Sequence, residues 1–178
     1  MRLFTGIALP PEARAPLLAL VDHLRPLAAL AWTPEAKLHI TTKFIGEWPE
    51  SRLAELQQVL SAVTISEPVD IHICRLGWMP NPRSPLTLFA GVEMSTHLPQ
   101  LTEEILEGLG ILKEKRIYRP HVTLGRIRRA GRDPIEALQA ELHHTDLDLA
   151  PFRATAFHLY LSSGGTYTKL SEYPLPNP

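Results

Sequence analysis

Two short segments of the sequence each place a histidine and a threonine two positions apart inside an apolar run: His39 with Thr41, and His121 with Thr123. Along a β-strand, successive side chains alternate between the two faces, so the histidine and the threonine of each segment project to the same side. If the two strands lie next to each other, two imidazoles and two hydroxyls meet at one spot. This arrangement suits acid–base chemistry around an anionic group such as a phosphate.

A third histidine–threonine pair, in His143-His144-Thr145, lacks this context. It follows a helix-like segment, precedes Asp146 and Asp148, and has no apolar alternation around it. We interpret these histidines as the end of a helix, where a positively charged side chain interacts favourably with the helix dipole. The bare triplet is therefore a weak signal, and the other two are distinguished by their position in apolar strands.

The bulk composition predicts a folded protein of ordinary charge. The chain has 178 residues, 44% of them hydrophobic, and a formal net charge of −1. This excludes a broadly basic protein that holds nucleic acid by its overall charge. One stretch that brackets the second histidine is nonetheless basic, and we expect it to attract an anionic ligand. Its basic residues are Lys113, Lys115, Arg116, Arg119, Arg126, Arg128, Arg129 and Arg132, with Glu114 as its acidic residue.

Cysteine usage and the N-terminus indicate a protein that is not exported. The single Cys74 cannot form an intrachain disulfide, and its place in the alternating run 69–74 predicts a buried, reduced thiol. Pro10 and Pro11 interrupt the apolar N-terminal run too early for a signal peptide or a membrane span. We expect a cytoplasmic protein with no membrane partner.

Hydrophobic periodicity predicts strands and helices in an order that occurs twice. The expected strands cover 2–9, the His39 segment and 69–76, then 86–94, the His121 segment and 153–162. The expected helices cover 11–30, 50–62, 98–110 and 134–143. A proline-rich loop at 80–85 separates the two halves.

The two halves also resemble each other in sequence. His39 and His121 are 82 positions apart (121 minus 39), and the apolar strings at 3–7 and 88–92 are similar. We interpret residues 1–178 as a single bilobal domain built from a duplicated β-α-β-α-β unit, at about 1–77 and 86–162. The expected fold class is α+β, with two pseudo-symmetric lobes, each an antiparallel sheet flanked by helices, and the active-site cleft between them.

These segments resemble a known family over almost the whole chain. The sequence is similar to the RNA 2′,3′-cyclic phosphodiesterases of bacteria and archaea, long called 2′-5′ RNA ligases, of the two-histidine (2H) phosphoesterase superfamily. The resemblance rests on the opening strand 2–10, the two motifs His39-Ile40-Thr41-Thr42 and His121-Val122-Thr123-Leu124, the loop 77–83, and the closing segments 157–162 and 167–168. Thr42 departs from the apolar residue more usual at its place, and its side chain is expected to point away from the cleft.

The resemblance implies hydrolysis of an RNA terminal 2′,3′-cyclic phosphate to a 2′-phosphate, with no metal and no cofactor. It assigns His39 as the proton donor and His121 as the proton acceptor, and these roles exchange in the reverse direction, an ATP-independent 2′-5′ ligation. The residues permit this chemistry, because histidine changes its charge near neutral pH. Thr41 and Thr123 would donate hydrogen bonds to the non-bridging phosphate oxygens.

Three basic residues near the motifs are further candidates for substrate binding. Arg126 matches a frequent basic position of the family, although regular alternation places it opposite His121 unless a bulge near Gly125 turns it back. Arg119 and Lys43 share the motif faces by alternation and are expected to meet RNA backbone phosphates. The same alternation places Phe44 on the opposite side from His39. Tyr118, Trp32 and Trp78 could stack on a base, but buried packing is the more common fate of such rings.

Two other functions stay open. The first is a metal hydrolase, although the sequence shows no close-spaced ligand motif of the kind zinc sites have. Its ligands would come from His39, His121, His143, His144 and His158 and from the nearby Asp146 and Asp148. The second is a non-catalytic nucleotide- or RNA-binding module that uses the same cleft for recognition. The expected partners are RNA ends or small cyclic-phosphate nucleotides, and the protein is expected to be a monomer.

Overall fold

The structure is a computed structural model that describes residues 1–113, 117–127 and 135–176. Its helices are α1 (Pro11–Leu24), α2 (Leu53–Leu60), α3 (Leu98–Glu107) and α4 (Glu136–Leu142), with single 3₁₀ turns at Arg25–Leu27, Glu35–Lys37 and Glu50–Arg52. Its strands are β1 (Arg2–Ala8), β2 (Ala31–Trp32), β3 (His39–Glu47), β4 (Val69–Met79), β5 (Thr87–Met94), β6 (His121–Arg126), β7 (Phe152–Ala154), β8 (Ala156–Ser163) and β9 (Thr166–Pro174).

All of these strands belong to one curled sheet rather than to two separate ones. The order along the sheet is β7-β4-β5-β6-β3-β1-β8-β9, and β2 pairs with β6. The two motif strands, β3 and β6, are neighbours at its centre and pair antiparallel through Ile40 and Val122. The sequence expectation that the two histidine strands lie side by side is therefore confirmed.

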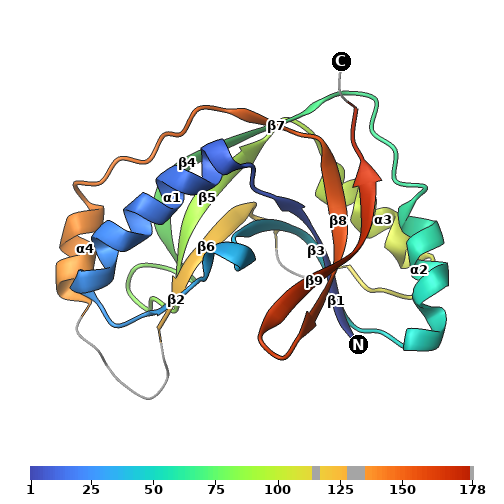
Figure 1. The fold of residues 1–178 in the computed structure, drawn as a ribbon, viewed down its shortest axis with the longest axis horizontal. Helices are drawn as coiled ribbons and strands as arrows, with labels where there is room; N and C mark the ends of the chain where they lie inside the picture. Colours follow the sequence, from blue (N-terminus) through green and yellow to red (C-terminus); the bar gives the residue numbers. More distant parts are fainter. Residues whose placement is uncertain (114–116, 128–134, 177–178) are drawn as a thin grey trace.

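The sheet forms two lobes that stand side by side (Figure 1). We call β3, β1, β8 and β9, with α2 and α3, the first lobe, and β6, β5, β4 and β7, with α1 and α4, the second lobe. This confirms the predicted α+β class with two pseudo-symmetric lobes. The two halves of the sequence exchange strands, however, because β4 lies in the second lobe and β8 in the first, so the units 1–77 and 86–162 do not each build one lobe.

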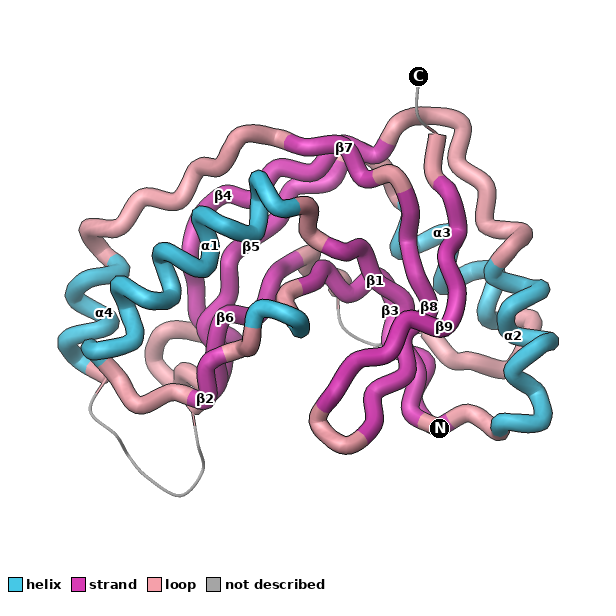
Figure 2. The backbone as a smooth tube through the Cα atoms, in the orientation of Figure 1, coloured by secondary structure: helices cyan, strands magenta, loops and turns pink. Residues whose placement is uncertain are grey.

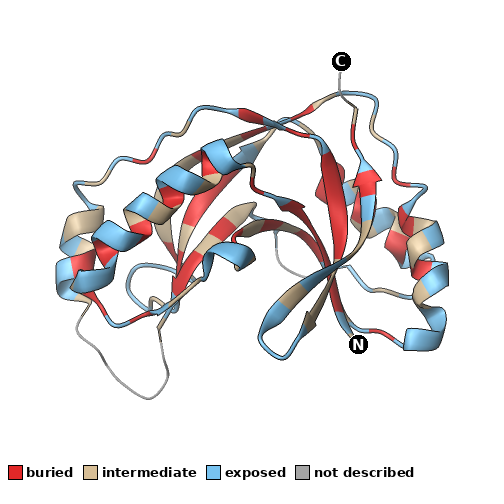
Figure 3. Ribbon diagram, viewed as in Figure 1, coloured by how far each residue is buried: buried red, intermediate tan, exposed pale blue. Residues whose placement is uncertain are grey.

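The helices cover one face of the sheet and leave the other face for the site. On β4, Val69, Ile71 and Ile73 are buried while the residues between them are partly or fully exposed, which is the pattern of a strand with one covered face. The buried residues of α1 recur at helical spacing and pack on this covered face (Figure 3). Helix α1 is shorter than expected, because Pro26 lacks the N–H that would continue it.

Two features of the strands were not predicted from the sequence. One is β9, which forms a C-terminal hairpin of the first lobe with β8, itself within the expected strand 153–162, and the other is β2, a short strand beside β6. Residues 143–151 run as an extended connection from α4 to β7 along the outside of the second lobe (Figure 2). Cys74 forms an isolated bridge with Asp148 of this connection and is half-buried, so the expected fully buried thiol is wrong.

Each motif strand is interrupted by a β-bulge shortly after its threonine. In β3, Thr41 pairs with Gly6 and Lys43 with Thr5, so Thr42 is the extra residue. In β6, Thr123 pairs with Phe89 and Gly125 with Leu88, so Leu124 is the extra residue. A bulge reverses the alternation of faces beyond it, and this decides which later side chains reach the site.

Candidate active site

A cleft of about 680 Å³ lies on the open face of the sheet, at the junction of the two motif strands. This volume is within the usual range for sites that bind small ligands. Both predicted histidines and both predicted threonines line it, together with Arg126 and residues of β1, β2 and β9. The structure thus brings together the two pairs that the sequence places 82 positions apart (121 minus 39).

Both histidines are anchored in the same way. The Nδ1–H of His39 donates to the backbone carbonyl of Lys37 at 2.7 Å, and the Nδ1–H of His121 donates to the carbonyl of Arg119 at 2.7 Å. A carbonyl oxygen only accepts, so Nδ1 carries the proton in each neutral ring and Nε2 holds the free lone pair. Each ring therefore offers Nε2 as its proton-transfer atom.

The hydroxyl of Thr41 lies 2.9 Å from Nε2 of His39. In the neutral ring this hydroxyl donates to Nε2, and in the charged ring it accepts from it. The backbone of the same threonine is held by Tyr118, whose phenolic O–H donates to the Thr41 carbonyl at 2.6 Å. Tyr118 thus supports the motif strand and is not a wall of the cleft.

The surroundings keep both imidazoles in their neutral form to a lower pH than usual. Burial, first of all, and then the positive charges of His121 and Arg126 lower the pKa of His39, against the Lys37 carbonyl, which raises it. Burial and then Arg126 likewise lower the pKa of His121, against the Arg119 carbonyl. A bound anion would oppose these effects by stabilising the charged rings.

Aromatic rings enclose His39 more than His121. The ring of Phe4 lies 4.9 Å from that of His39, and Tyr167 meets it edge-on at 5.2 Å. Against His121, Phe89 makes an edge-on contact at 5.7 Å. The sequence does not predict these rings as part of the site, because Tyr167 lies in a strand that the periodicity does not indicate and Phe4 carries no signal beyond strand propensity.

Gly6 also shapes the wall behind His39. A Cβ added at this position would lie 2.8 Å from the carbonyl oxygen of Ile40 and 3.3 Å from Cδ2 of His39. Backbone atoms cannot yield as a flexible side chain does, so the close approach of β1 to β3 here requires glycine.

Arg126 lies in the cleft, where regular alternation would not have placed it. The bulge at Leu124 supplies the reversal, and the backbone of Arg126 pairs with Ala31 of β2. From the sequence, this position of Arg126 depends on a bulge near Gly125, and the structure has that bulge at Leu124. Trp32, from the same short strand, also lines the cleft, whereas Trp78 is buried in the core.

Lys43 is not in the cleft, and its expected contact with substrate is wrong. The bulge at Thr42 turns it to the covered face, where its side chain is 3% exposed and its ammonium pairs with Glu103. The same reversal brings Phe44 into the cleft, against the expectation that it faces away. Thr42 does point away, and its hydroxyl is hydrogen-bonded to that of Thr5 at 2.7 Å.

Two more residues of the basic stretch that the structure describes, Arg119 and Lys113, do not line the cleft. Arg119 offers its carbonyl to His121, but its exposed side chain is not among those that line the cleft. Lys113 pairs with Glu107 at 3.2 Å. Five members of the basic stretch lie outside the described residues: Lys115, Arg116, Arg128, Arg129 and Arg132.

The third histidine–threonine pair lies where the sequence predicted, at the end of a helix. Helix α4 ends at Leu142, and the Nδ1–H of His143 donates to the carbonyl of Gln139 at 2.6 Å. None of its residues lines the cleft.

The model of a known protein family matches most of this chain. The family model of the 2′-5′ RNA ligase superfamily matches residues 9–166. The chain belongs to the 2′-5′ RNA ligase superfamily. This confirms the resemblance inferred from the two motifs, since both lie within the matched range.

Relatives of this chain are named RNA 2′,3′-cyclic phosphodiesterase. An RNA 2′,3′-cyclic phosphodiesterase of Archaeoglobus fulgidus is 31% identical over 72% of this chain and 74% of its own length. One from Methanocaldococcus jannaschii is 27% identical over 97% of this chain and 100% of its own length.

Solved structures of other proteins have a similar fold over almost the whole of this chain. A Thermus thermophilus protein superposes with a TM-score of 0.75 at 27% identity, over 98% of this chain and 97% of that one. The Escherichia coli protein LigT, solved with 3′-AMP, superposes with a TM-score of 0.72 at 21% identity, over 99% and 98% of the two chains. Within the described part of the chain, no helix has the length and apolar character needed to cross a membrane.

Proposed function

We propose that this protein hydrolyses the 2′,3′-cyclic phosphate at RNA ends to a 2′-phosphate. The observation that carries the proposal is the matched anchoring of His39 and His121, which leaves Nε2 of each as the proton-transfer atom beside one cleft. The relatives named RNA 2′,3′-cyclic phosphodiesterase support the same reaction. The substrates proposed are RNA ends or small cyclic-phosphate nucleotides, acted on by a monomeric, cytoplasmic enzyme.

In the proposed mechanism, the phosphorus lies between the two rings. Nε2 of neutral His121 takes a proton from a water molecule as its oxygen forms a bond to phosphorus. The bond between phosphorus and the 3′ oxygen breaks, and Nε2–H of protonated His39 gives its proton to that oxygen. The products are a 2′-phosphate and a free 3′-hydroxyl, and the ring protonation states are exchanged until solvent restores them.

Hydrogen-bond donors around the phosphate stabilise the charge that grows on its non-bridging oxygens. The hydroxyls of Thr41 and Thr123 and the guanidinium of Arg126 are the donors proposed for this role. The hydroxyl of Thr41 is hydrogen-bonded to Nε2 of His39, so binding of phosphate redirects this hydroxyl. With the 5′-hydroxyl of a second RNA in place of water, the same displacement forms a 2′-5′ phosphodiester and frees the 3′-hydroxyl without ATP. The two histidines exchange roles when that linkage is cleaved back to the cyclic phosphate.

The first test uses an RNA oligonucleotide that ends in a 2′,3′-cyclic phosphate. We expect the 2′-phosphate as product and a loss of roughly 10²–10⁴-fold in kcat for His39→Ala and for His121→Ala. His143→Ala is the matched control, because it removes a histidine of the same sequence pattern outside the cleft. Full activity in a chelator would exclude the metal hydrolase, and binding without turnover would favour the non-catalytic module.

The second test separates the acid from the base. In a substrate whose 3′ bridging oxygen is replaced by sulfur, the leaving thiolate needs no proton. We expect this substrate to restore much of the activity of His39→Ala and little of that of His121→Ala. The opposite pattern would reverse the two assignments.

A further inference from the structure

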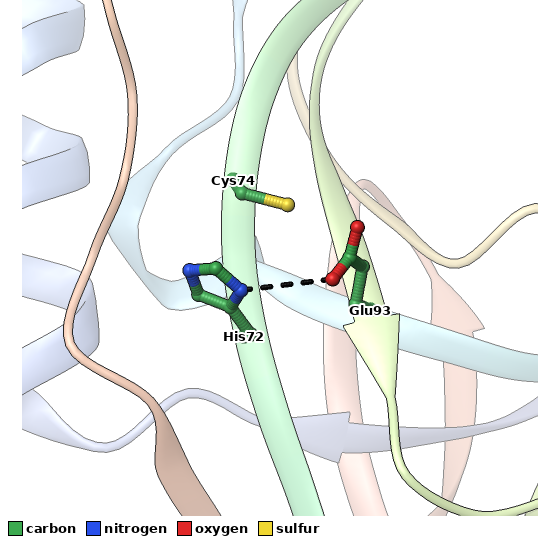
Figure 4. Close-up of side chains that lie close together, drawn as sticks. All are labelled: His72, Cys74 and Glu93. Atoms are coloured by element: carbon green, nitrogen blue, oxygen red, sulfur yellow. Dashed lines mark ion pairs between the residues drawn. The ribbon is translucent and has the colours of Figure 1, made fainter.

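A second group of chemically capable side chains lies away from the catalytic histidines. His72 and Cys74 project from β4, and Glu93 projects from the neighbouring strand β5 (Figure 4). One ligand atom from each, a ring nitrogen, the thiol sulfur and a carboxylate oxygen, lies within 4.8 Å of the other two. The register explains the meeting, because His72 and Glu93 are cross-strand partners and Cys74 is two positions beyond His72 on the same face.

Asp148 fixes which nitrogen of His72 faces the group. Its carboxylate lies 2.5 Å from Nε2 of His72, so in the neutral ring Nε2–H donates to Asp148 and Nδ1 carries the lone pair. Nδ1 lies 3.7 Å from the Glu93 carboxylate. A histidine held by a carboxylate on one nitrogen, with its other nitrogen directed at further donor atoms, has the arrangement of a metal-binding imidazole.

We propose that His72, Cys74 and Glu93 bind a divalent metal ion of the Zn²⁺ type. Nitrogen, thiolate and carboxylate donors together suit Zn²⁺, and three protein ligands leave a fourth tetrahedral position for water. Tetrahedral zinc places a nitrogen and an oxygen ligand roughly 3.3–3.5 Å apart. Nδ1 of His72 and the Glu93 oxygen, at 3.7 Å, need only a small approach to reach this separation. Binding turns the Cys74 thiol into a thiolate and releases its proton to solvent.

Arg75 is the competitor of the metal ion. Its guanidinium lies 3.3 Å from the Glu93 carboxylate and 3.7 Å from the Cys74 sulfur. A metal ion that takes both groups displaces this guanidinium, which is 59% exposed and free to turn into solvent. Removing the competing charge should therefore tighten binding.

The site would connect two consecutive strands with a segment that lies far from them in sequence. Its ligands join β4 to β5, and Asp148 adds the long connection between α4 and β7 through its bridge to Cys74. Arg75 has a backbone φ of 61°, which marks the irregularity of β4 at this point. We assign the metal ion a structural role, since the proposed hydrolysis uses none of these residues.

The test is zinc binding to the full, tag-free chain after treatment with a chelator. Calorimetric titration with Zn²⁺ should give one equivalent bound by the wild type and none by Cys74→Ser or His72→Gln. Asp148→Asn should weaken binding roughly 10- to 100-fold, as loss of a partner that orients a ligand does. Arg75→Ala should bind several-fold more tightly. Thermal unfolding followed by circular dichroism checks that each variant folds.

Two controls separate this site from other histidines. His97→Gln, an exposed histidine elsewhere, and the double variant His39→Ala/His121→Ala should both keep the bound equivalent. Cobalt(II) gives an independent readout, because a thiolate-to-cobalt absorption band requires Cys74 as a ligand. The proposal is overturned if the wild type binds no zinc, if Cys74→Ser and His72→Gln bind it unchanged, or if the double variant loses it.

Discussion

Phe44 and Arg126 occupy corresponding places on the two motif strands, one from each lobe. Each lies five positions after its histidine, each follows a bulge, and each lines the cleft. One side of the pseudo-symmetric site therefore ends in an apolar ring and the other in a guanidinium. This difference gives two similar strands different tasks, because a guanidinium can donate hydrogen bonds to a charged phosphate oxygen and a phenyl ring cannot.

Replacement of Arg126 tests this difference. Arg126→Ala should lower kcat/KM about 10²–10³-fold on a cyclic-phosphate substrate, because it removes a charged donor from the phosphate oxygens. Arg126→Lys should recover part of the loss, since it keeps the charge but not the planar fork. Arg119→Ala is the control and should stay near the wild-type value. A large effect of Arg119→Ala would show that its side chain does reach the substrate.

The two bulges also mark the limit of prediction from the sequence. Alternation placed each histidine with its threonine correctly, because both precede the bulge. Beyond it, the same rule placed Lys43 in the cleft and Phe44 outside, and both were wrong. The position of a bulge depends on how neighbouring strands pair, and the residue type of Thr42 does not indicate it. The wall behind His39 was missed for a similar reason, since Tyr167 reaches it only through the sheet order.

The lowered pKa values of the two catalytic histidines set the pH dependence. Activity needs one ring charged and one neutral, and this state is most populated between the two apparent pKa values of the pair. Because burial and Arg126 lower both from 6.5, the maximum of kcat/KM should lie below pH 6.5. The bound phosphate stabilises the charged ring, so the maximum of kcat should lie at higher pH. Initial rates from pH 4 to 9 check both, and a kcat/KM maximum above pH 7 would contradict the assignment.

The pair formed by Lys43 and Glu103 should matter for stability and not for catalysis. Glu103→Gln leaves a nearly buried ammonium without its charged partner and should lower the free energy of unfolding by about 3 kcal/mol. Lys43→Met should cost less, because the Glu103 side chain left behind is 23% exposed and can be hydrated. Urea unfolding measures both. The folded Lys43→Met protein should keep kcat/KM within about twofold of the wild-type value, because Lys43 donates no hydrogen bond to the phosphate in the proposed mechanism. A larger loss would show that the Lys43 side chain contacts the substrate.

Removal of the Tyr167 ring should raise the pKa of His39. Burial is the largest cause of its lowered pKa, and the edge of Tyr167 covers the imidazole at 5.2 Å. In Tyr167→Ala, water reaches the ring and stabilises its charged form, so the pKa of His39 moves up toward 6.5 while that of His121 stays. Titration of the histidine ring signals by NMR measures both in one experiment. Tyr167→Phe keeps the aromatic ring over His39 and should leave both pKa values unchanged. An equal rise of the His39 pKa in Tyr167→Phe would show that the phenolic hydroxyl, and not burial by the ring, causes the effect.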